Sequence, residues 1–257
     1  MSFRWHHEVS ADWMKARGEY LMASDIVALL PAYRRAVKAK WTPGTIVPEF
    51  AALYAEKQSD MTLKTETWDA AARGHFVEPY AVNELSHVVM CNLHHWDDVL
   101  IHDHEEVLGF SPDAADVRQD YSAVDLSADD WGHIDFVAEV KCYEPKKHMK
   151  SVLANTGDLP EMYQLATAFK VLPNVEVGWL FFYCPSAPYP MKPIRMRRDQ
   201  LDDHFKVIDG IKEMWLDTMH VVETLGNGLS KYEPMYTEGQ LMEYYMDQQD
   251  GSMFVLK

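Results

Sequence analysis

Residues 133–145, HIDFVAEVKCYEP, decide the fold of this chain. When the stretch is read with a period of two, one side carries the apolar residues Ile134, Phe136, Ala138, Val140 and Cys142. The other side carries Asp135, Val137, Glu139 and Lys141. This alternation predicts a β-strand with one face in a core. Because an unpaired charge is costly to bury, Glu139 and Lys141 on one face need an explanation if that face is buried or lines a cleft.

Helical patterns come before this strand in the sequence. Residues 24–30 begin with Ser24, a good N-cap, and Pro31 is expected to limit that helix or to start a second one. Residues 66–89 also have a helical pattern, with Pro79 as a kink or a restart. The broad apolar face expected for that helix consists of Trp68, Ala71, Ala72, Phe76, Tyr80 and Leu85.

Strand and helix patterns alternate in the rest of the chain. Residues 99–110 are strand-like, and the acidic residues 114–132 are expected to form a hairpin or a loop. The later patterns predict a helix over 157–172, a strand over 175–185 and a long amphipathic helix over 197–226 that stops at Gly226. This order predicts an α/β fold with an additional helical N-terminal part. We expect one domain over residues 1–257, with 227–257 as a C-terminal tail at a subunit or partner contact.

The composition is that of a globular protein. The chain has 257 residues, of which 47% are hydrophobic, and this allows one large domain or two small ones with a sizeable core. No run approaches the roughly 18 apolar residues of a membrane span, and the start of the chain, MSFRWHHEVSADW, lacks the apolar segment of a signal peptide. We therefore expect a soluble, intracellular protein with no membrane partner. Cys91, Cys142 and Cys184 form no CxxC pair, so neither a disulfide framework nor a four-cysteine metal site is expected.

The formal net charge is −16, from 24 basic and 40 acidic residues. This charge argues against a protein that coats nucleic acid through bulk attraction, but it is compatible with a narrow DNA-binding cleft that uses a few basic residues. The basic groups are Arg34, Arg35, Lys38 and Lys40; Lys141, Lys146, Lys147 and Lys150; and Arg195, Arg197 and Arg198. For any one of these groups, a solvated surface is the more common explanation.

Carboxylates at several positions accompany the strand that carries Glu139 and Lys141. Asp113 comes where a predicted strand ends, Glu78 lies on the helix before, and Gln164 lies on the helix after. Three carboxylates beside a lysine suit a hard divalent cation such as Mg²⁺, which polarises a phosphoryl oxygen and lowers the pKa of a bound water. The lysine can orient or deprotonate the attacking water and stabilise negative charge. Alone, this pattern is weak, and a solvated strand face is the alternative.

Six motifs follow one another in the chain. They are WMKARGEYLMASDI (13–26), ARGHFVEPYA (72–81), LGFSPDA (108–114), AEVKC (138–142), EMYQLATAFKVL (161–172) and GWLFFYCP (178–185). In this order they resemble the YqaJ-like viral recombinase family, which includes phage lambda exonuclease and belongs to the PD-(D/E)xK nuclease superfamily. The resemblance implies a restriction-endonuclease-like core, a mixed central sheet flanked by helices. The chain departs from the family pattern at Ala114, where the SPDG turn has Gly, and at Cys184, where Y-D-P has Asp.

The resemblance also implies a role for each matching residue. Asp113, Glu139 and the main-chain carbonyl of Val140 would bind Mg²⁺, and Glu78 would assist at the metal. Lys141 would activate the water, and Gln164 would support the lysine and the scissile phosphate. Arg17 and Ser24 would bind the 5′-phosphate of a DNA end. A serine at a helix N-terminus, beside free backbone N–H groups and an arginine, suits a phosphate on physical grounds as well, although Asp25 beside it is adverse.

The activity that the resemblance implies is a Mg²⁺-dependent, ATP-independent 5′→3′ exonuclease on linear double-stranded DNA, with Mn²⁺ as a substitute metal. It would release 5′-mononucleotides and leave a 3′ single strand for a phage single-strand annealing protein. The implied assembly is a ring-shaped homotrimer around the DNA, in the cytoplasm of a bacterial host. Two alternatives stay open. One is a PD-(D/E)xK endonuclease or nickase, and the other is a DNA-end-binding protein without nuclease activity.

A histidine-rich stretch allows one further hypothesis. His94, His95, His102 and His104 lie among acidic residues, and this composition allows a zinc or second-metal site. The favoured interpretation is a polar strand face beside the acidic segment between Asp113 and Glu139, a segment that is longer and more acidic than in the lambda enzyme. The tyrosine-rich tail, with Tyr232, Tyr236, Tyr244 and Tyr245, is expected to pack on the body or on a neighbouring subunit rather than to stack on bases.

Overall fold

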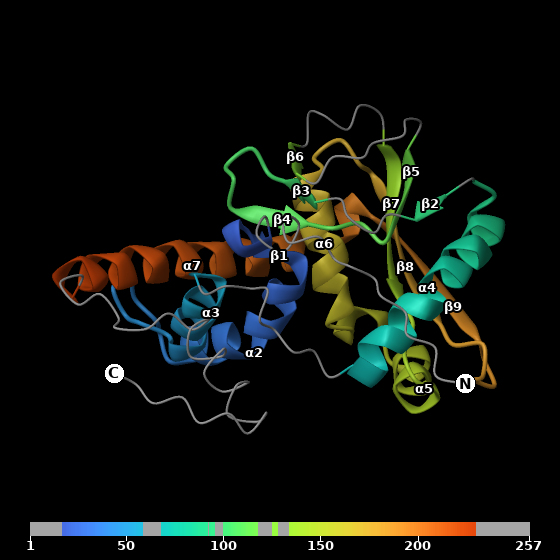
Figure 1. Ribbon diagram of the computed structural model, residues 1–257, viewed down its shortest axis with the longest axis horizontal. Helices are drawn as coiled ribbons and strands as arrows, with labels where there is room; N and C mark the ends of the chain where they lie inside the picture. Colours follow the sequence, from blue (N-terminus) through green and yellow to red (C-terminus); the bar gives the residue numbers. More distant parts are fainter. Residues whose placement is uncertain are drawn as a thin grey trace, which may run out of the picture. The chain divides into compact units, whose positions relative to one another are not determined.

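A five-stranded mixed sheet is the central element of the fold (Figure 1). The structure is a computed structural model, and it describes residues 17–58, 68–91, 93–95, 100–117, 125–127 and 134–229. The strands are β2 (His94–His95), β5 (Ala114–Val117), β7 (Ile134–Lys141), β8 (Val177–Tyr183) and β9 (Met191–Arg197), in the order β2-β5-β7-β8-β9. β7 and β8 are parallel, and the other pairs are antiparallel. The strand predicted at residues 134–142 is therefore the middle strand of this sheet.

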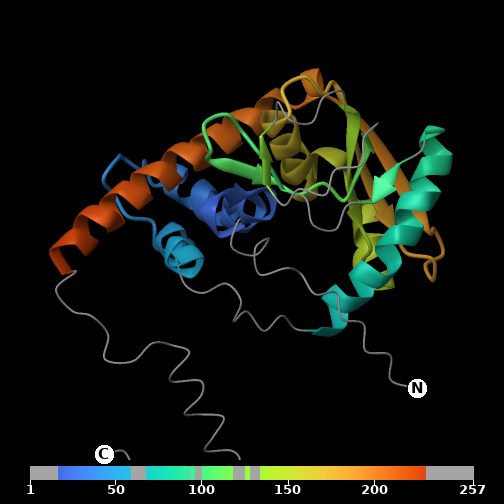
Figure 2. The same cartoon turned by 45° about the horizontal axis from the view of Figure 1, so that its top comes forward.

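Helices cover both faces of the sheet, as the two views in Figures 1 and 2 show. On one face, α4 (Trp68–Val89) places Val82 and Leu85 in a buried cluster with Ala138 and Val140 of β7. These β7 residues are the apolar face that the sequence predicted. Burial of this seam removes apolar surface from water and holds the carboxyl end of β7 in place.

The opposite face of the sheet is also buried. It is covered by α6 (Glu161–Val171), which packs so closely that a Cβ atom on Gly178 of β8 would lie 2.8 Å from Leu165 Cδ1. Val137 and Glu139 of β7 share this face with Gly178, and they are 0% and 3% exposed. The sequence predicted only one core face for this strand. The structure shows that the charged face is buried as well, as in parallel strands with helices on both sides.

A second sheet contains four short strands. These are β1 (Leu21–Met22), β3 (Leu100–His102), β4 (Leu108–Phe110) and β6 (Asp125–Ser127), in the order β1-β4-β3-β6. They account for the strand-like residues 99–110 and for part of the acidic segment, of which residues 118–124 and 128–133 lie outside the described ranges. The predicted helical N-terminal part is confirmed by α2 (Ala23–Lys38) and α3 (Pro48–Gln58).

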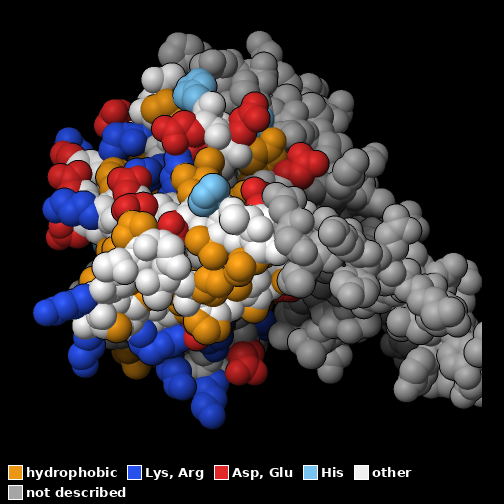
Figure 3. Space-filling view, turned by 90° about the vertical axis from the view of Figure 1, so that its left-hand side faces the viewer, with side chains coloured by type: hydrophobic (Ala, Val, Ile, Leu, Met, Phe, Trp, Pro, Cys, Tyr) orange, Lys and Arg blue, Asp and Glu red, His pale blue; other side chains and the backbone are white. Residues whose placement is uncertain are grey.

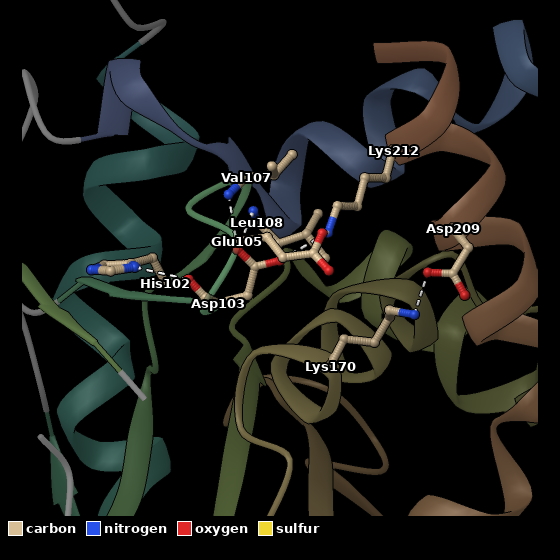
Figure 4. A network of polar contacts seen from close by, with 8 residues as sticks. All are labelled: His102, Asp103, Glu105, Val107, Leu108, Lys170, Asp209 and Lys212. Carbon is tan, nitrogen blue, oxygen red and sulfur yellow. Dashed lines mark hydrogen bonds and ion pairs between the residues drawn. The ribbon is translucent and has the colours of Figure 1, made fainter. Parts of the chain in front are cut away.

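A buried carboxylate organises the turn between β3 and β4 (Figure 4). Asp103 is 8% exposed, and its Oδ1 accepts hydrogen bonds from the backbone N–H groups of Val107 (2.8 Å) and Leu108 (3.1 Å). Its Oδ2 pairs with Lys212 at 3.2 Å, and Lys212 also pairs with Glu105 at 2.6 Å. Lys212 belongs to α7 (Asp202–Leu229), so this network joins the first part of α7 to the second sheet.

Two prolines lie inside helices that the sequence predicted to end or kink there. α2 continues through Pro31, and α4 continues through Pro79. The residues around Pro31 include the buried Leu30 and Ala32. A proline in a helix interior costs about 3 kcal/mol because it lacks the N–H for one backbone hydrogen bond. The burial of apolar side chains on this face of α2 offsets that cost.

The apolar face predicted for α4 is only partly right. Leu85 is buried, but Phe76 and Tyr80 are 50% and 60% exposed. The buried stripe instead consists of Val77, Ala81, Val82 and Leu85. Trp68, Ala71 and Ala72 have side chains that lie outside the described residues.

The chain divides into two units, Met1–Thr218 and Met219–Lys257. The described part of the second unit is the end of α7, which continues through Gly226 to Leu229, so the predicted stop at Gly226 is wrong. The rest of the tail, with its four tyrosines, lies outside the described residues, and one nuclease domain with a tail remains a prediction. In the part of the chain that is described, no helix is long and apolar enough to cross a membrane.

Acidic and basic side chains are interspersed along one edge of the face shown in Figure 3, with hydrophobic side chains gathered toward its centre. Several of the basic residues are structural. Arg198 donates to the backbone carbonyls of Phe169, Leu172 and Val175 at the end of α6, at 2.5–3.0 Å. Arg35 is paired with Glu49. Arg35 and Arg198 therefore have contacts within the protein that explain their presence without nucleic-acid binding.

Candidate active site

Asp113 and the end of β7 meet at one place. Ala114 of β5 pairs with Ala138 of β7, so Asp113, just before β5, lies next to the following residues of β7. The backbone N–H of Val140 donates to Asp113 Oδ2 at 2.6 Å. On the same strand, Lys141 Nζ forms an ion pair with Glu139 Oε1. The buried carboxylate is therefore paired with the lysine two residues further along, which explains why this strand can carry both charges on a buried face.

Burial dominates the electrostatics of this group. It raises the pKa of Asp113 well above its usual value, and the charges of Glu139 and Glu78 raise it further. Burial also raises the pKa of Glu139, against the lowering effect of Lys141. For Lys141, burial favours the neutral amine, but Glu139 and Asp113 outweigh it and the pKa is raised. Lys141 is thus an ammonium, and Glu78 belongs to the same electrostatic group as Asp113 and Glu139.

Among the described residues, the formal charges that act on Asp113 and Glu139 are predominantly negative. The carboxylates that act on one another are Glu78, Asp113, Glu139 and Glu161, and the cations among them are Lys141 and Arg73. Four negative and two positive groups leave a formal charge of −2. Oxygen ligands with this charge suit a hard divalent cation. No three His, Cys, Asp or Glu side chains of the described residues are gathered closely enough to enclose an ion. The donor set thus fits such a cation in the kind of ligand and in formal charge, but not in the spacing of the described side chains.

Arg73, Tyr143 and Glu161 complete the site, and the sequence did not single them out. Arg73 Nη1 donates to the carbonyl oxygen of Cys142 at 3.2 Å, directly after Lys141. The hydroxyl of Tyr143 donates to Glu161 Oε1 at 2.6 Å. All three lie in or beside the quoted motifs, but only the folded chain brings them together. Burial, with the charges of Glu78 and Asp113, raises the pKa of the Cys142 thiol to about 12, so this cysteine is an unreactive thiol here.

Gln164 lies on α6, three residues after Glu161. Its helix covers the face of the sheet on which Glu139 lies, as the packing of α6 on Gly178 shows. The side chain is half-buried. The structure thus places Gln164 on the helix that the sequence predicted, next to the strand with the carboxylate and the lysine.

Arg17 and Ser24 form a second group at the start of α2. Arg17 Nη2 donates to Ser24 Oγ at 3.2 Å, and Ser24 is exposed. The N-cap of α2 is Met22 rather than Ser24, since Asp25 Oδ2 accepts from the Met22 N–H at 2.9 Å and starts the helix earlier. Asp25 also pairs with the buried Lys57 at 2.7 Å. This pairing neutralises the adverse charge noted in the sequence.

Lys57 is the residue of this second group that sequence analysis missed. Its side chain is 4% exposed, and besides Asp25 its Nζ contacts the carbonyl oxygen of Arg17 at 3.0 Å. The lysine comes from the end of α3, more than 30 residues away in the chain. A lysine at the end of an exposed helix pattern gives no sign of such burial, so no sequence signal could have identified it.

Among the described residues, no contact supports the zinc or second-metal site considered for the four histidines. The ring of His102 stacks on Tyr20 with centroids 4.9 Å apart, and its Nδ1 lies 3.0 Å from the Asp103 carbonyl. His104 lies exposed in the turn after β3. The side chains of His94 and His95 lie outside the described residues.

Comparison with known proteins identifies the family. The family model described as the YqaJ-like viral recombinase domain matches residues 12–171. The chain belongs to this family. The match includes Arg17, Ser24, Glu78 and the β7 group, which consists of Asp113, Glu139 and Lys141. It confirms the resemblance seen in the motifs.

Solved structures share the fold of this YqaJ-family chain. The alkaline exonuclease LHK-Exo from Laribacter hongkongensis is 16% identical with a TM-score of 0.59, and its complex with dAMP is 17% identical with a TM-score of 0.60. Each comparison covers 86% of this chain and 99% of that chain. A phage-related exonuclease from Haemophilus somnus 129PT is 10% identical over 79% of this chain and 95% of that chain, with a TM-score of 0.48. No curated protein matches the chain. The folds of the two LHK-Exo structures confirm the predicted restriction-endonuclease-like α/β core.

Proposed function

We propose that this protein is a divalent-metal-dependent exonuclease that degrades one strand of linear double-stranded DNA from its 5′ end. The observation that carries the proposal is the contact of Asp113 with β7 beside the ion pair of Glu139 and Lys141. Together with the neighbouring Glu78, Glu161 and Arg73, these described groups have a formal charge of −2. Mg²⁺ is the proposed metal and Mn²⁺ its substitute. Asp113, Glu139 and the carbonyl of Val140 would hold the cation, and Glu78 would assist. The bound cation would polarise the scissile phosphate and lower the pKa of a water.

Each remaining side chain has a task that follows from its charge and position. The ammonium of Lys141, held beside Glu139, donates hydrogen bonds to the attacking water and to a phosphoryl oxygen and stabilises the charge that develops there. Gln164, on the helix over the same face, orients that lysine and the phosphate. The close fit of α6 and α4 on the sheet keeps these groups in a low-dielectric setting, where such interactions are stronger than in water.

Arg17 and Ser24 are proposed to bind the 5′-phosphate of the DNA end. Ser24 is exposed in the first turn of α2, where free backbone N–H groups and the helix dipole favour an anion. Arg17 already contacts Ser24, and Lys57 balances the charge of Asp25. The arrangement therefore offers positive charge and hydrogen-bond donors to a terminal phosphate.

The wider context rests on the family. LHK-Exo is an alkaline exonuclease that has been solved in complex with dAMP, and this supports release of 5′-mononucleotides here. We propose a ring-shaped homotrimer that encircles DNA, since topological trapping would hold DNA on a protein with a net charge of −16. A phage single-strand annealing protein is the proposed partner, in the cytoplasm of a bacterial host.

The test is digestion of a linear duplex labelled at one end, with Mg²⁺ or with EDTA. Wild type is expected to release mononucleotides from 5′-phosphorylated ends, while Lys141→Ala is expected to be inactive and Arg17→Ala to lose the preference for 5′-phosphate over 5′-hydroxyl ends. Internal fragments would instead indicate the endonuclease or nickase. End binding in EDTA without digestion in Mg²⁺ would indicate the DNA-end-binding protein.

A further inference from the structure

Glu161 has a buried carboxylate oxygen without a partner in the described structure. The residue is 6% exposed, and Oε1 accepts the hydrogen bond from Tyr143. Oε2 has no hydrogen-bond partner. A buried polar atom without a hydrogen-bond partner destabilises the folded state, more so when it carries charge, so native proteins rarely keep one without a reason.

The surroundings of Glu161 show which kind of partner would suit it. Tyr143 comes two residues after Lys141, and Glu161 begins α6, which covers the face of β7 that carries Glu139. The pair of Tyr143 and Glu161 therefore lies beside the β7 group, and the charge of Glu161 acts on Glu139. An anion such as a DNA phosphate would be repelled by a carboxylate. The nearby ammonium of Lys147 lies over the Tyr143 ring, 3.5 Å from its centroid. A cation or its bound water is the partner that fits both the charge and the empty acceptor.

We propose that Glu161 is a further residue of the divalent-cation site. Tyr143 holds Oε1 and so directs Oε2 toward the cation or toward a water bound to it. This inference rests on the proposed metal dependence. It assigns the fourth carboxylate of the site, which neither the motif pattern nor its spacing indicated, and it explains why an acidic residue is buried at the first position of α6. Residues that orient a metal shell commonly change metal affinity by about 10–100-fold when they are altered.

Cation binding to the full-length protein without DNA tests the proposal. Isothermal titration with MgCl₂ or MnCl₂ and cation-induced thermal shift would be measured for wild type, Glu161→Gln, Glu161→Asp and Tyr143→Phe. Glu161→Gln is expected to weaken binding by about 10–100-fold, and Glu161→Asp and Tyr143→Phe by less. Glu213→Gln changes an exposed glutamate on α7 and is the matched control, with unchanged affinity expected.

The outcomes separate this inference from the proposed function. If wild type binds the cations and Glu161→Gln binds them equally well, the role of Glu161 is refuted while metal dependence stands. If wild type binds neither cation, with or without DNA, the proposed metal dependence fails and this inference fails with it. If Glu161→Gln does not fold, Tyr143→Phe decides: unchanged affinity in that folded variant overturns the directing role of Tyr143 and with it the proposal.

Discussion

Replacement of Lys57 by methionine is expected to destabilise the protein markedly. The side chain of Lys57 is 4% exposed and that of Asp25 is 17% exposed, and the two are 2.7 Å apart. Removal of one partner of a fully buried ion pair costs about 3–5 kcal/mol, because the other charge stays buried. In the variant, the Asp25 carboxylate still accepts the hydrogen bond from the Met22 N–H and still has partial access to solvent. The expected loss in the free energy of unfolding is therefore near the lower end of this range, about 3 kcal/mol. The carbonyl of Arg17 also loses the Lys57 donor.

The measurement is the free energy of unfolding from urea denaturation, supported by thermal melting. At about 2–4 °C per kcal/mol, Lys57→Met should lower Tm by about 6–12 °C. The double variant Lys57→Met with Asp25→Asn removes both charges and keeps an acceptor for the Met22 N–H, so it should recover most of the loss. Lys38→Met is the matched control, because Lys38 is exposed on α2, and it should change stability by less than about 0.5 kcal/mol. A loss below about 1 kcal/mol in Lys57→Met, or a double variant as unstable as the single one, would refute the reasoning.

Four other predictions follow from the packing and from the charges of the two groups. Gly178→Ala should cost about 1–3 kcal/mol in urea denaturation, because the added Cβ would lie 2.8 Å from Leu165; unchanged stability would show that α6 can move away. Asp113→Asn should raise Tm in EDTA at neutral pH. Because the pKa of Asp113 is raised in the folded state, its contribution to stability is present below the unfolded pKa of about 4 and is lost as the pH rises. The higher Tm of the variant should therefore vanish at low pH. A difference in Tm that does not depend on pH would contradict this. Lys141→Met should abolish digestion yet tighten Mg²⁺ binding in titrations, since a competing and repelling cation is gone; weaker binding would contradict the model of competition. Lys57→Met should lower the ratio of kcat/KM for 5′-phosphate over 5′-hydroxyl ends, and an unchanged ratio would separate Lys57 from end recognition.

The central strand and its flanking helices could be predicted because their patterns are local. Alternation over residues 134–142 identified β7, and the motif order identified the family. The burial of the Glu139 face could not be read from the same pattern, because it depends on α6 packing across Gly178. The strand β9 (Met191–Arg197) was missed because it is an edge strand with Pro193 and three basic residues, and its outer residues need no apolar alternation.

The contacts of the basic residues likewise depend on tertiary structure and could not be predicted from the sequence. Arg198 belongs to a cluster that suggested nucleic-acid binding, yet it donates to carbonyls of residues 23–29 positions away at the end of α6. Lys192 similarly donates to the carbonyls of Ser151, Val152 and Ala154 at the end of α5 (Pro145–Leu153). Cations favour helix carboxyl ends, but which cation reaches which end depends on tertiary structure. Charge clusters in the sequence therefore do not separate DNA-binding residues from helix caps.

The charges of Glu139 and Lys141 on the central strand have one common physical explanation. On a doubly covered strand, Glu139 is tolerable only if a cation accompanies it, and without metal that cation is Lys141. Two of the other carboxylates, Asp113 and Glu161, are each held at one oxygen, by the Val140 N–H and the Tyr143 hydroxyl. Among the described residues, these donors orient the two carboxylates and do not compensate the excess negative charge of the site. A divalent cation would compensate this charge, and Lys141 would then be free to act on a phosphate.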